Sequence, residues 1–241
     1  MSAEGEPAGG GGARRLAGAV VGLSTALVIV GATIALFFNP AWVSFEQVRA
    51  EVTAWTGWTP AQVDAVSRDV VAEVWLGPGT FAQEVAGAPV FDERERSHMA
   101  DVRRVVLGFY ALVGLGLAAL VVGGLAWRRS RWFWRAVSWG AAGLAVGAAV
   151  VGSAFFVFFD TAFTLFHEIF FAAGTWTFDP ATDRLVQLFP YRFWTETSIA
   201  VAIVGLVLTT AVWALARRRA GPGHGARIAS GALTPGGEEG R

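Results

Sequence analysis

Four long stretches without a single charged residue are the most restrictive feature of this chain of 241 residues. About 20 apolar residues are enough for a helix to cross the hydrocarbon core of a bilayer. A backbone in lipid must satisfy its hydrogen bonds within its own segment, and a helix does so. The sequence therefore predicts an all-α membrane protein whose four transmembrane helices occupy residues 16–38, 105–127, 136–159 and 197–216.

The composition agrees with this class and excludes others. Hydrophobic residues make up 54% of the chain and charged residues 16%, whereas an ordinary soluble domain carries about 25% charged residues. One soluble core of this size could not hide so much apolar surface. The balance of 19 basic and 19 acidic residues gives no support to a nucleic-acid-binding face. The absence of cysteine excludes disulfides, thiolate metal sites and a cysteine nucleophile.

The arginines predict how the chain is oriented. Basic residues concentrate in cytoplasmic loops, and three arginine clusters lie at 14–15, 128–135 and 217–219. They share one side if both termini are cytoplasmic. The first apolar stretch is longer than the 7–15 residues of a signal-peptide core, so we expect a retained helix. This topology gives cytoplasmic tails, expected to be disordered, at 1–15 and 217–241, a cytoplasmic loop at 128–135, and extracytoplasmic segments at 39–104 and 160–196.

The neutral total charge conceals a polarised protein. The predicted cytoplasmic segments hold 11 arginines and 4 acidic residues, and the extracytoplasmic segments hold 8 arginines and 15 acidic residues. The two sides thus carry net charges of +7 and −7. An acidic outer side favours a substrate that bears a free ammonium group.

Helix-capping patterns predict a helical cap in the first outer segment. A capping box pairs Ser, Thr or Asp with Glu or Gln three residues later, and we interpret three such pairs as helix starts: Ser44 with Gln47, Thr59 with Gln62, and Asp92 with Glu95. We expect helices near 45–56 and 60–76, and a third that continues into the second span. Within the third span, Gly143 and Gly147 have a spacing that favours close helix packing.

Two of the three histidines lie beside the membrane. His98 precedes the second span by seven residues, and Asp101 can reach its imidazole on the same helix face. His167 lies among phenylalanines at helical spacing, which is typical of an interfacial helix. Because histidine changes charge near neutral pH, two histidines at one site can act as base and acid. We assign no role to His224, in the C-terminal tail.

The residues alone leave other interpretations open. An interfacial histidine is often a hydrogen-bonding surface residue. Ser97 adjoins His98, but neighbours on a helix point apart, so a serine nucleophile has little support. Two histidines with Asp101 or Glu168 could hold a metal ion, although no ligand-spacing pattern marks such a site.

Several motifs together resemble the lipoprotein intramolecular transacylase (Lit) family. They are the stretch 91–102 (FDERERSHMADV), the stretch 166–171 (FHEIFF), the run 176–180 (WTFDP), Asp183, and 188–190 (LFP). The four-span layout also agrees, so the resemblance covers most of the chain outside its tails. The broader family consists mostly of uncharacterised bacterial membrane proteins.

The resemblance implies an acyltransferase of the bacterial cytoplasmic membrane with its active face extracytoplasmic. The acyl chain at sn-2 of a diacylglyceryl lipoprotein would move to the amine of the N-terminal cysteine, by general acid–base catalysis and without a cofactor. His98 and His167 match the two functional histidines of the family. Orienting or substrate-positioning roles are expected for Asp101, Glu168, Trp176, Asp179 and Asp183.

Two alternatives accompany this prediction. The Ala-, Gly- and Arg-rich composition resembles proteins of high-GC bacteria, whereas the characterised transacylases come from low-GC Gram-positive bacteria. The motifs could therefore serve acyl transfer or hydrolysis on another membrane lipid. The other alternative is a non-enzymatic four-span protein whose outer cap binds a partner. The sequence leaves the oligomeric state open.

Overall fold

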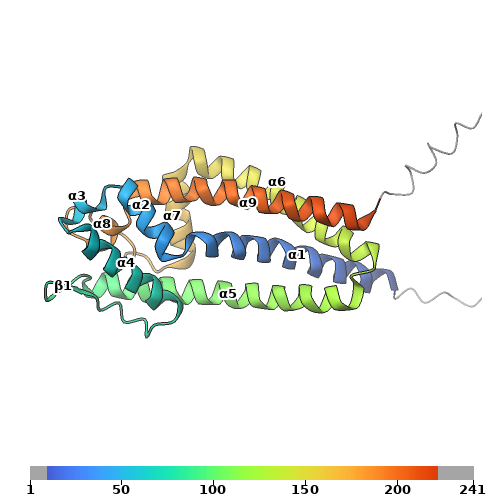
Figure 1. Cartoon of the computed structure of the whole chain (residues 1–241), viewed down its shortest axis with the longest axis horizontal. Coiled ribbons are helices and arrows are strands. Elements are labelled where there is room, and N and C mark those ends of the chain that lie inside the picture. Colours follow the sequence, from blue (N-terminus) through green and yellow to red (C-terminus); the bar gives the residue numbers. More distant parts are fainter. Residues whose placement is uncertain (1–9, 222–241) are drawn as a thin grey trace, which may run out of the picture.

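The protein is described by a computed structural model that covers residues 10–221, with side chains described for 11–153 and 157–221. Four long helices form a bundle (Figure 1): α1 (Gly10–Phe37), α5 (Glu93–Trp127), α6 (Arg131–Val157) and α9 (Tyr191–Ala220). Each is long and apolar enough to cross a membrane. The prediction of an all-α membrane protein with four transmembrane helices is confirmed, and the direction in which it crosses the bilayer stays a prediction.

The central helix of the bundle is α1, which packs against α5, α6 and α9, while α6 also packs along α9. Two glycines set the approach of α1 to α6, because a Cβ atom on Gly140 would lie 2.2 Å from the carbonyl oxygen of Gly22. Small residues allow such contact where lipid supplies no hydrophobic force between helices. The packing expected of Gly143 and Gly147 is absent from the described residues, where a Cβ atom on either would meet nothing within 4 Å.

This contact predicts the effect of adding one methyl group. Gly140→Ala forces α1 and α6 apart and should destabilise the bundle by about 1–3 kcal/mol, the usual cost of overpacking. Gly143→Ala is the matched control, because its added methyl group meets open space. Thermal unfolding in detergent, followed by circular dichroism, compares the two variants. Equal melting temperatures would contradict the tight contact between α1 and α6.

A small cap covers one end of the bundle (Figure 1). It comprises α2 (Pro40–Arg49), α3 (Val52–Thr56), α4 (Pro60–Trp75), a hairpin of β1 (Glu84–Val85) and β2 (Ala88–Pro89), and α8 (Arg184–Leu188). The valine stripe of α4 packs into one apolar core with Phe81, Phe91, Leu188 and Phe193. Because Leu188 and Phe193 come from the second outer segment, this core joins the two outer segments.

The capping predictions fare differently along the cap. Both bonds of the capping box form at Thr59 and at Asp92, as expected. The helix predicted over 45–56 is wrong: α2 begins earlier, because Asn39 accepts hydrogen bonds from the backbone of Ala41 and Trp42. That helix also breaks at Glu51, whose φ of 57° is left-handed.

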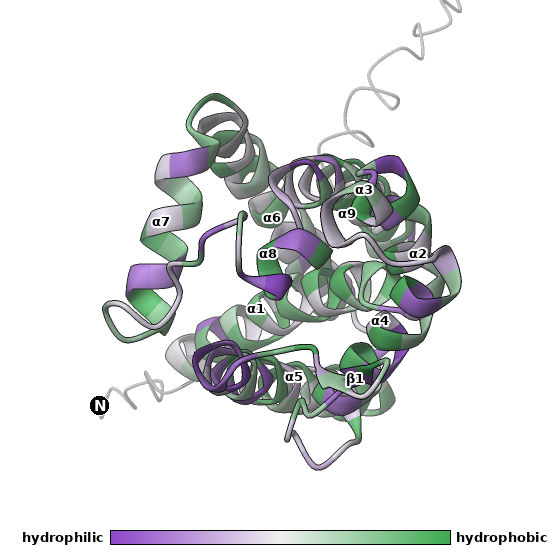
Figure 2. Cartoon of the chain, turned by 90° about the vertical axis from the view of Figure 1, so that its left-hand side faces the viewer, coloured by the Kyte–Doolittle hydropathy of each residue, from purple (hydrophilic) through white to green (hydrophobic). Residues whose placement is uncertain are grey.

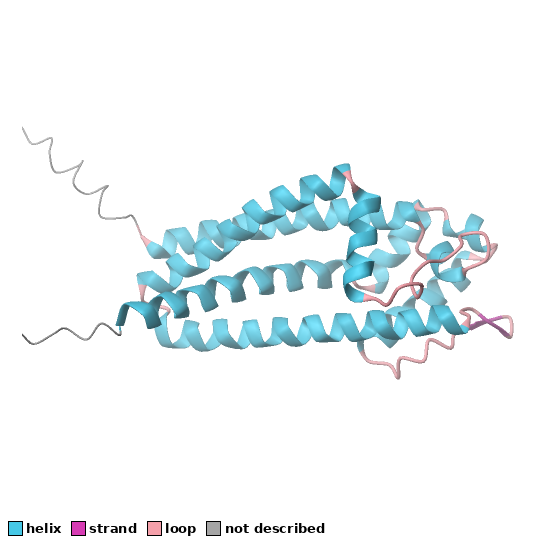
Figure 3. Cartoon of the chain, turned by 180° about the vertical axis from the view of Figure 1, so that it is seen from behind, coloured by secondary structure: helices cyan, strands magenta, loops and turns pink. Residues whose placement is uncertain are grey.

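The helix that carries His167 lies across the others. α7 (Phe159–Phe170) runs nearly perpendicular to the long helices (Figure 3) and, viewed from the cap end, lies to one side of the bundle next to α6 (Figure 2). Its face with Leu165, Ile169 and Phe170 is exposed, and His167 is buried. This is the arrangement expected of an amphipathic helix that lies in the plane of a membrane interface.

The ends of the bundle differ from the expected tails. α1 already begins at Gly10, and α9 continues to Ala220. Helical structure therefore extends into both segments, 1–15 and 217–241, that the sequence predicts to be disordered. The rest of those tails, including His224, lies outside the described residues.

Candidate active site

The two membrane-proximal histidines meet beneath the cap. The ring centroids of His98, on α5, and His167, on α7, lie 6.0 Å apart, and the ring planes are inclined by only 21°. Both side chains are buried, with 6% and 9% of their surface exposed. The structure thus brings together the two candidate catalytic residues from helices far apart in the sequence.

Aromatic rings surround the pair. His98 contacts Phe171 and Phe178, with centroid distances of 4.8 and 5.4 Å. His167 lies 4.1 Å from the ring of Phe163 and 5.0 Å from the ring of Trp176. Such walls exclude water and strengthen electrostatic interactions inside the site.

An ion pair fixes the second outer segment onto α5. Arg94 lies one helical turn before His98, and its Nη2 donates a hydrogen bond of 2.7 Å to the Asp183 carboxylate. Its Nη1 donates to the carbonyl oxygen of Thr177 at 3.1 Å, and its guanidinium lies over the ring of Phe178. Arg94 therefore holds the loop 177–183 against the helix that carries His98.

A buried carboxylate makes a second connection. Glu95 is 2% exposed; one of its oxygens caps the start of α5 by accepting from the Asp92 backbone at 2.8 Å, and the other accepts from the Leu185 backbone at 2.7 Å. Burial raises the pKa of Glu95. The capping box was visible in the sequence, but the bond to Leu185 joins distant segments and left no local signal there.

The tautomer of His167 follows from its hydrogen bond. Its Nδ1 lies 2.7 Å from the carbonyl oxygen of Phe163. A carbonyl oxygen only accepts, so Nδ1 must carry the hydrogen. In the neutral ring Nε2 is then the unprotonated nitrogen, free to accept a proton.

Burial keeps both histidines neutral. His98 belongs to the first turns of α5, where residues 93–104 hold seven charged side chains and precede the apolar span. Burial, followed by the neighbouring His167, lowers the pKa of His98 to about 4, and the charge of Asp101 opposes this shift. Burial likewise lowers the pKa of His167, against the effect of its bond to Phe163. Two neutral imidazoles are therefore present at pH 7.

Two polar atoms of the site have no hydrogen-bond partner. Among the described residues, four buried side-chain atoms lack one, and two of these are His98 Nδ1 and Trp176 Nε1. Buried polar groups are nearly always paired, and exceptions often mark functional positions. Here one exception belongs to a histidine of the pair, and the other to an aromatic ring that lies against the pair.

The other candidate residues have distinct positions. Asp101 pairs with Arg104 on its own helix. The Asp183 carboxylate also accepts from the Asp179 backbone at 2.7 Å, which holds the turn that includes Pro180. Glu168 is exposed and makes no hydrogen bond or ion pair among the described residues. Sequence reasoning missed Arg94, although it belongs to the stretch 91–102 that carries the resemblance.

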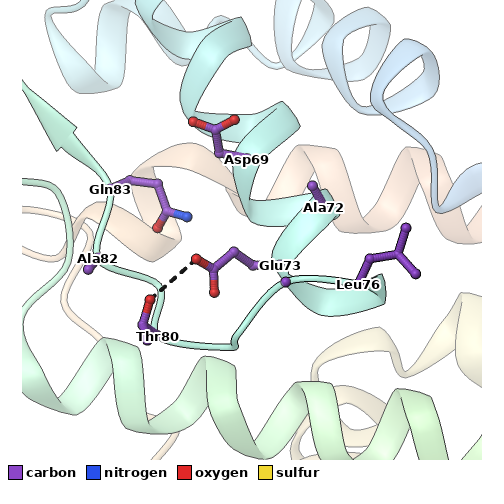
Figure 4. Close-up of a pocket in the computed structure, with 8 residues that line it drawn as sticks. Asp69, Ala72, Glu73, Leu76, Thr80, Ala82 and Gln83 are labelled. Atoms are coloured by element: carbon purple, nitrogen blue, oxygen red, sulfur yellow. Dashed lines mark hydrogen bonds between the residues drawn. The ribbon is translucent and has the colours of Figure 1, made fainter.

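Two hollows lie on the surface at the cap end of the described structure. One, of about 540 Å³, is lined by Asp92, Glu93, Arg94, Ser97 and Thr175. Ser97 directly precedes His98 in the sequence. The other, of about 480 Å³, lies between α4 and the segment before β1 (Figure 4), with Asp69, Glu73 and Gln83 among its lining residues. No group of three or more His, Asp or Glu side chains placed to hold a metal ion occurs within 10–221.

Fold and site together define an integral membrane protein with a buried histidine pair at the junction of its helices and cap. The sequence model of lipoprotein intramolecular transacylase Lit matches residues 19–194. The chain therefore belongs to the lipoprotein intramolecular transacylase family, a family of membrane acyltransferases, which confirms the resemblance found in the sequence.

Solved structures show the same fold. The membrane integral lipoprotein intramolecular transacylase Lit from Bacillus cereus superposes with a TM-score of 0.74 at 19% identity, covering 90% of this chain and 99% of that one. A variant of it with one histidine replaced by alanine gives 0.70, again at 19% identity, over 90% and 97% of the two chains. An uncharacterised protein from Aquifex aeolicus is 29% identical over 121 residues, half of this chain and 54% of that protein. The match thus spans about half the length of that curated relative.

Proposed function

We propose that this protein transfers an acyl chain within a bacterial lipoprotein, from sn-2 of the diacylglyceryl group to the α-amine of the N-terminal cysteine. The observation that carries the proposal is the buried pair of neutral histidines, 6.0 Å apart, in which His167 presents an unprotonated Nε2. An O-to-N acyl shift needs a base that deprotonates the incoming ammonium and an acid that protonates the departing oxygen. The cysteine whose amine is acylated belongs to the substrate, which agrees with the absence of cysteine from this chain.

Intramolecular transfer places special weight on geometry. Amine and ester belong to one molecule, and holding them at attack distance replaces an encounter between two molecules by a conformational requirement. The aromatic walls around the histidines exclude water, and so favour attack by the amine over hydrolysis of the ester. The exposed apolar face of α7, with Ile169 and Phe170, would admit the acyl chains from the lipid side.

Proton transfers divide between the histidines. The ammonium loses a proton to His167 Nε2, and the free amine attacks the ester carbonyl carbon. As the carbon–oxygen bond breaks, the glycerol oxygen takes up a proton and the attacking nitrogen loses one. We assign this second exchange to His98, whose buried Nδ1 has no partner in the described structure. The products are an amide, a free sn-2 hydroxyl and one proton released to water.

Orientation and compartment are part of the proposal. The arginine excess of the predicted cytoplasmic segments supports an extracytoplasmic face for the histidine pair and a location in the bacterial cytoplasmic membrane. The acidic residues on that face favour a substrate with a free ammonium group over one whose amine is already acylated.

Mass spectrometry of lipoprotein N-termini tests the activity. The protein is expressed in a bacterium whose lipoproteins keep a free α-amine, with the empty vector as control. We expect an N-acylated cysteine on a lyso-glyceryl group, with total acyl content unchanged. Diacyl N-termini that stay unmodified in the presence of folded protein would refute transacylation. Loss of an acyl chain from lipoprotein or phospholipid would instead indicate hydrolysis, the related-lipid alternative.

The lowered pKa values predict the pH profile of the reaction. A base works unprotonated, and it takes its proton from the ammonium form of the substrate. The value of kcat/KM should therefore stay flat from pH 7.5 down to 6.5, and should fall only below the ordinary histidine pKa of about 6.5. Initial rates in vesicles between pH 5 and 8 measure this profile. A midpoint above pH 6.5 would contradict a buried, neutral base.

A further inference from the structure

The indole nitrogen of Trp176 is a donor without an acceptor. An indole N–H can donate one hydrogen bond and accepts none. Other tryptophans satisfy this donor inside the protein: Trp42 donates to Thr197, Trp75 to the carbonyl oxygen of Phe38, and Trp134 to that of Arg128. The Nε1 atom of Trp176 is buried and has no partner among the described residues. A bound ligand with an acceptor atom would complete it.

The position of this donor depends on the contacts that hold the loop 177–183 against α5. Trp176 adjoins Thr177, whose carbonyl oxygen accepts from Arg94 at 3.1 Å. The indole ring lies 5.0 Å from His167, centroid to centroid, with a tilt of 35°. The donor thus belongs to a held loop beside the ring that would remove the substrate proton, and is already oriented before substrate arrives.

A preorganised donor of this kind acts on developing negative charge. When an amine adds to an ester, the electron pair of the carbonyl π bond moves to oxygen, and the oxygen becomes an anion. A donor held in a dry site stabilises this anion more than the neutral carbonyl, and so lowers the barrier. None of the hydrogen bonds described for the site supplies a donor for that oxygen.

We propose that Trp176 Nε1–H donates a hydrogen bond to the carbonyl oxygen of the acyl group in transfer, and strengthens it in the tetrahedral intermediate. This inference rests on the proposed transacylase function and adds an oxyanion donor to it. The bond persists while the carbon–nitrogen bond forms. When the carbon–oxygen bond to glycerol breaks, the electron pair returns to the carbonyl, and the product amide oxygen leaves Trp176.

Removing only the N–H tests the assignment. Trp176→Phe keeps an aromatic ring and removes the donor; kcat should fall about 100-fold while KM changes little, in the range known for loss of one oxyanion donor. Trp139→Phe, at a residue 73% exposed on α6, makes the same replacement away from the site and should keep wild-type activity. Incorporating benzothienylalanine at position 176 exchanges only the N–H for sulfur, and separates the hydrogen bond from ring shape if Trp176→Phe fails to fold.

A spectroscopic arm distinguishes hydrogen bonding from packing. The substrate carries a ¹³C label at the sn-2 ester carbonyl and is bound to a His167→Ala background, in which turnover is slow enough for the spectrum of the bound substrate to be recorded. The labelled carbonyl stretch should lie at lower wavenumber with Trp176 present than with the benzothienyl residue. Equal stretches, or a benzothienyl enzyme within threefold of wild type, would overturn this inference. Wild-type protein that acylates no lipoprotein would overturn the proposed function itself.

Discussion

His167→Ala is expected to lower the rate of acyl transfer by about 1,000-fold, because it removes the nitrogen that we propose as the base for the substrate proton. His167→Asn sharpens the test. Its side-chain amide can still donate to the Phe163 carbonyl, as Nδ1 does at 2.7 Å, but it offers no base. We expect the asparagine variant to be as inactive as the alanine variant, because it keeps the hydrogen bond to Phe163 but has no group that can act as the base.

Mass spectrometry of lipoprotein N-termini provides the measurement, with protein levels matched in the membrane. Thr161→Ala is the control on the same helix, because this side chain is exposed and forms no hydrogen bond among the described residues. An asparagine variant with near wild-type activity would show that His167 only positions α7. Another group would then have to serve as the base.

Asp183→Ala should cost both activity and stability. Its carboxylate accepts from Arg94, from the Asp179 backbone and from the Thr182 hydroxyl, so truncation leaves three donors without this partner. One lost charge-assisted bond of this kind typically costs about 1–3 kcal/mol. Displacement of the loop should lower activity about 100-fold, the penalty expected for misplacing catalytic groups by about 1 Å.

A double-mutant cycle isolates the contribution of the ion pair. Arg94→Ala should resemble Asp183→Ala, and the double variant should be little worse than either, because both remove one connection. The pair of Arg68 with Asp64, one turn apart on α4 and largely exposed, is the control, and Asp64→Ala should change little. Strictly additive losses for Arg94 and Asp183 would refute a shared role in holding the loop.

Local signals in the sequence predicted much of the fold. The four uncharged stretches identify the long helices, and the capping boxes at Thr59 and Asp92 mark where two helices begin. Prediction failed at Ser44, because Asn39 followed by proline offered a stronger helix start five residues earlier. The close approach of α1 to α6 uses Gly140 and not Gly143, a choice that depends on how two distant helices meet.

The site was predictable in its members but not in its assembly. The predicted topology placed His98 and His167 outside and next to the membrane, and the motifs linked them. Nothing local showed that Arg94 would reach Asp183 or that Glu95 would reach Leu185, since each bond joins segments separated by two of the long helices. The tautomer of His167 likewise became readable only once its distance to Phe163 was known.

The connections through Arg94 and Glu95 have a consequence for biogenesis. During translation α5 emerges first, and Arg94 and Glu95 lack their partners Asp183 and Leu185 until α6, α7 and the following loop have been made. The newborn enzyme therefore stays inert until its second helical hairpin has entered the bilayer. Two fragments, divided in the short connection between α5 and α6, should regain activity only when produced in the same cell.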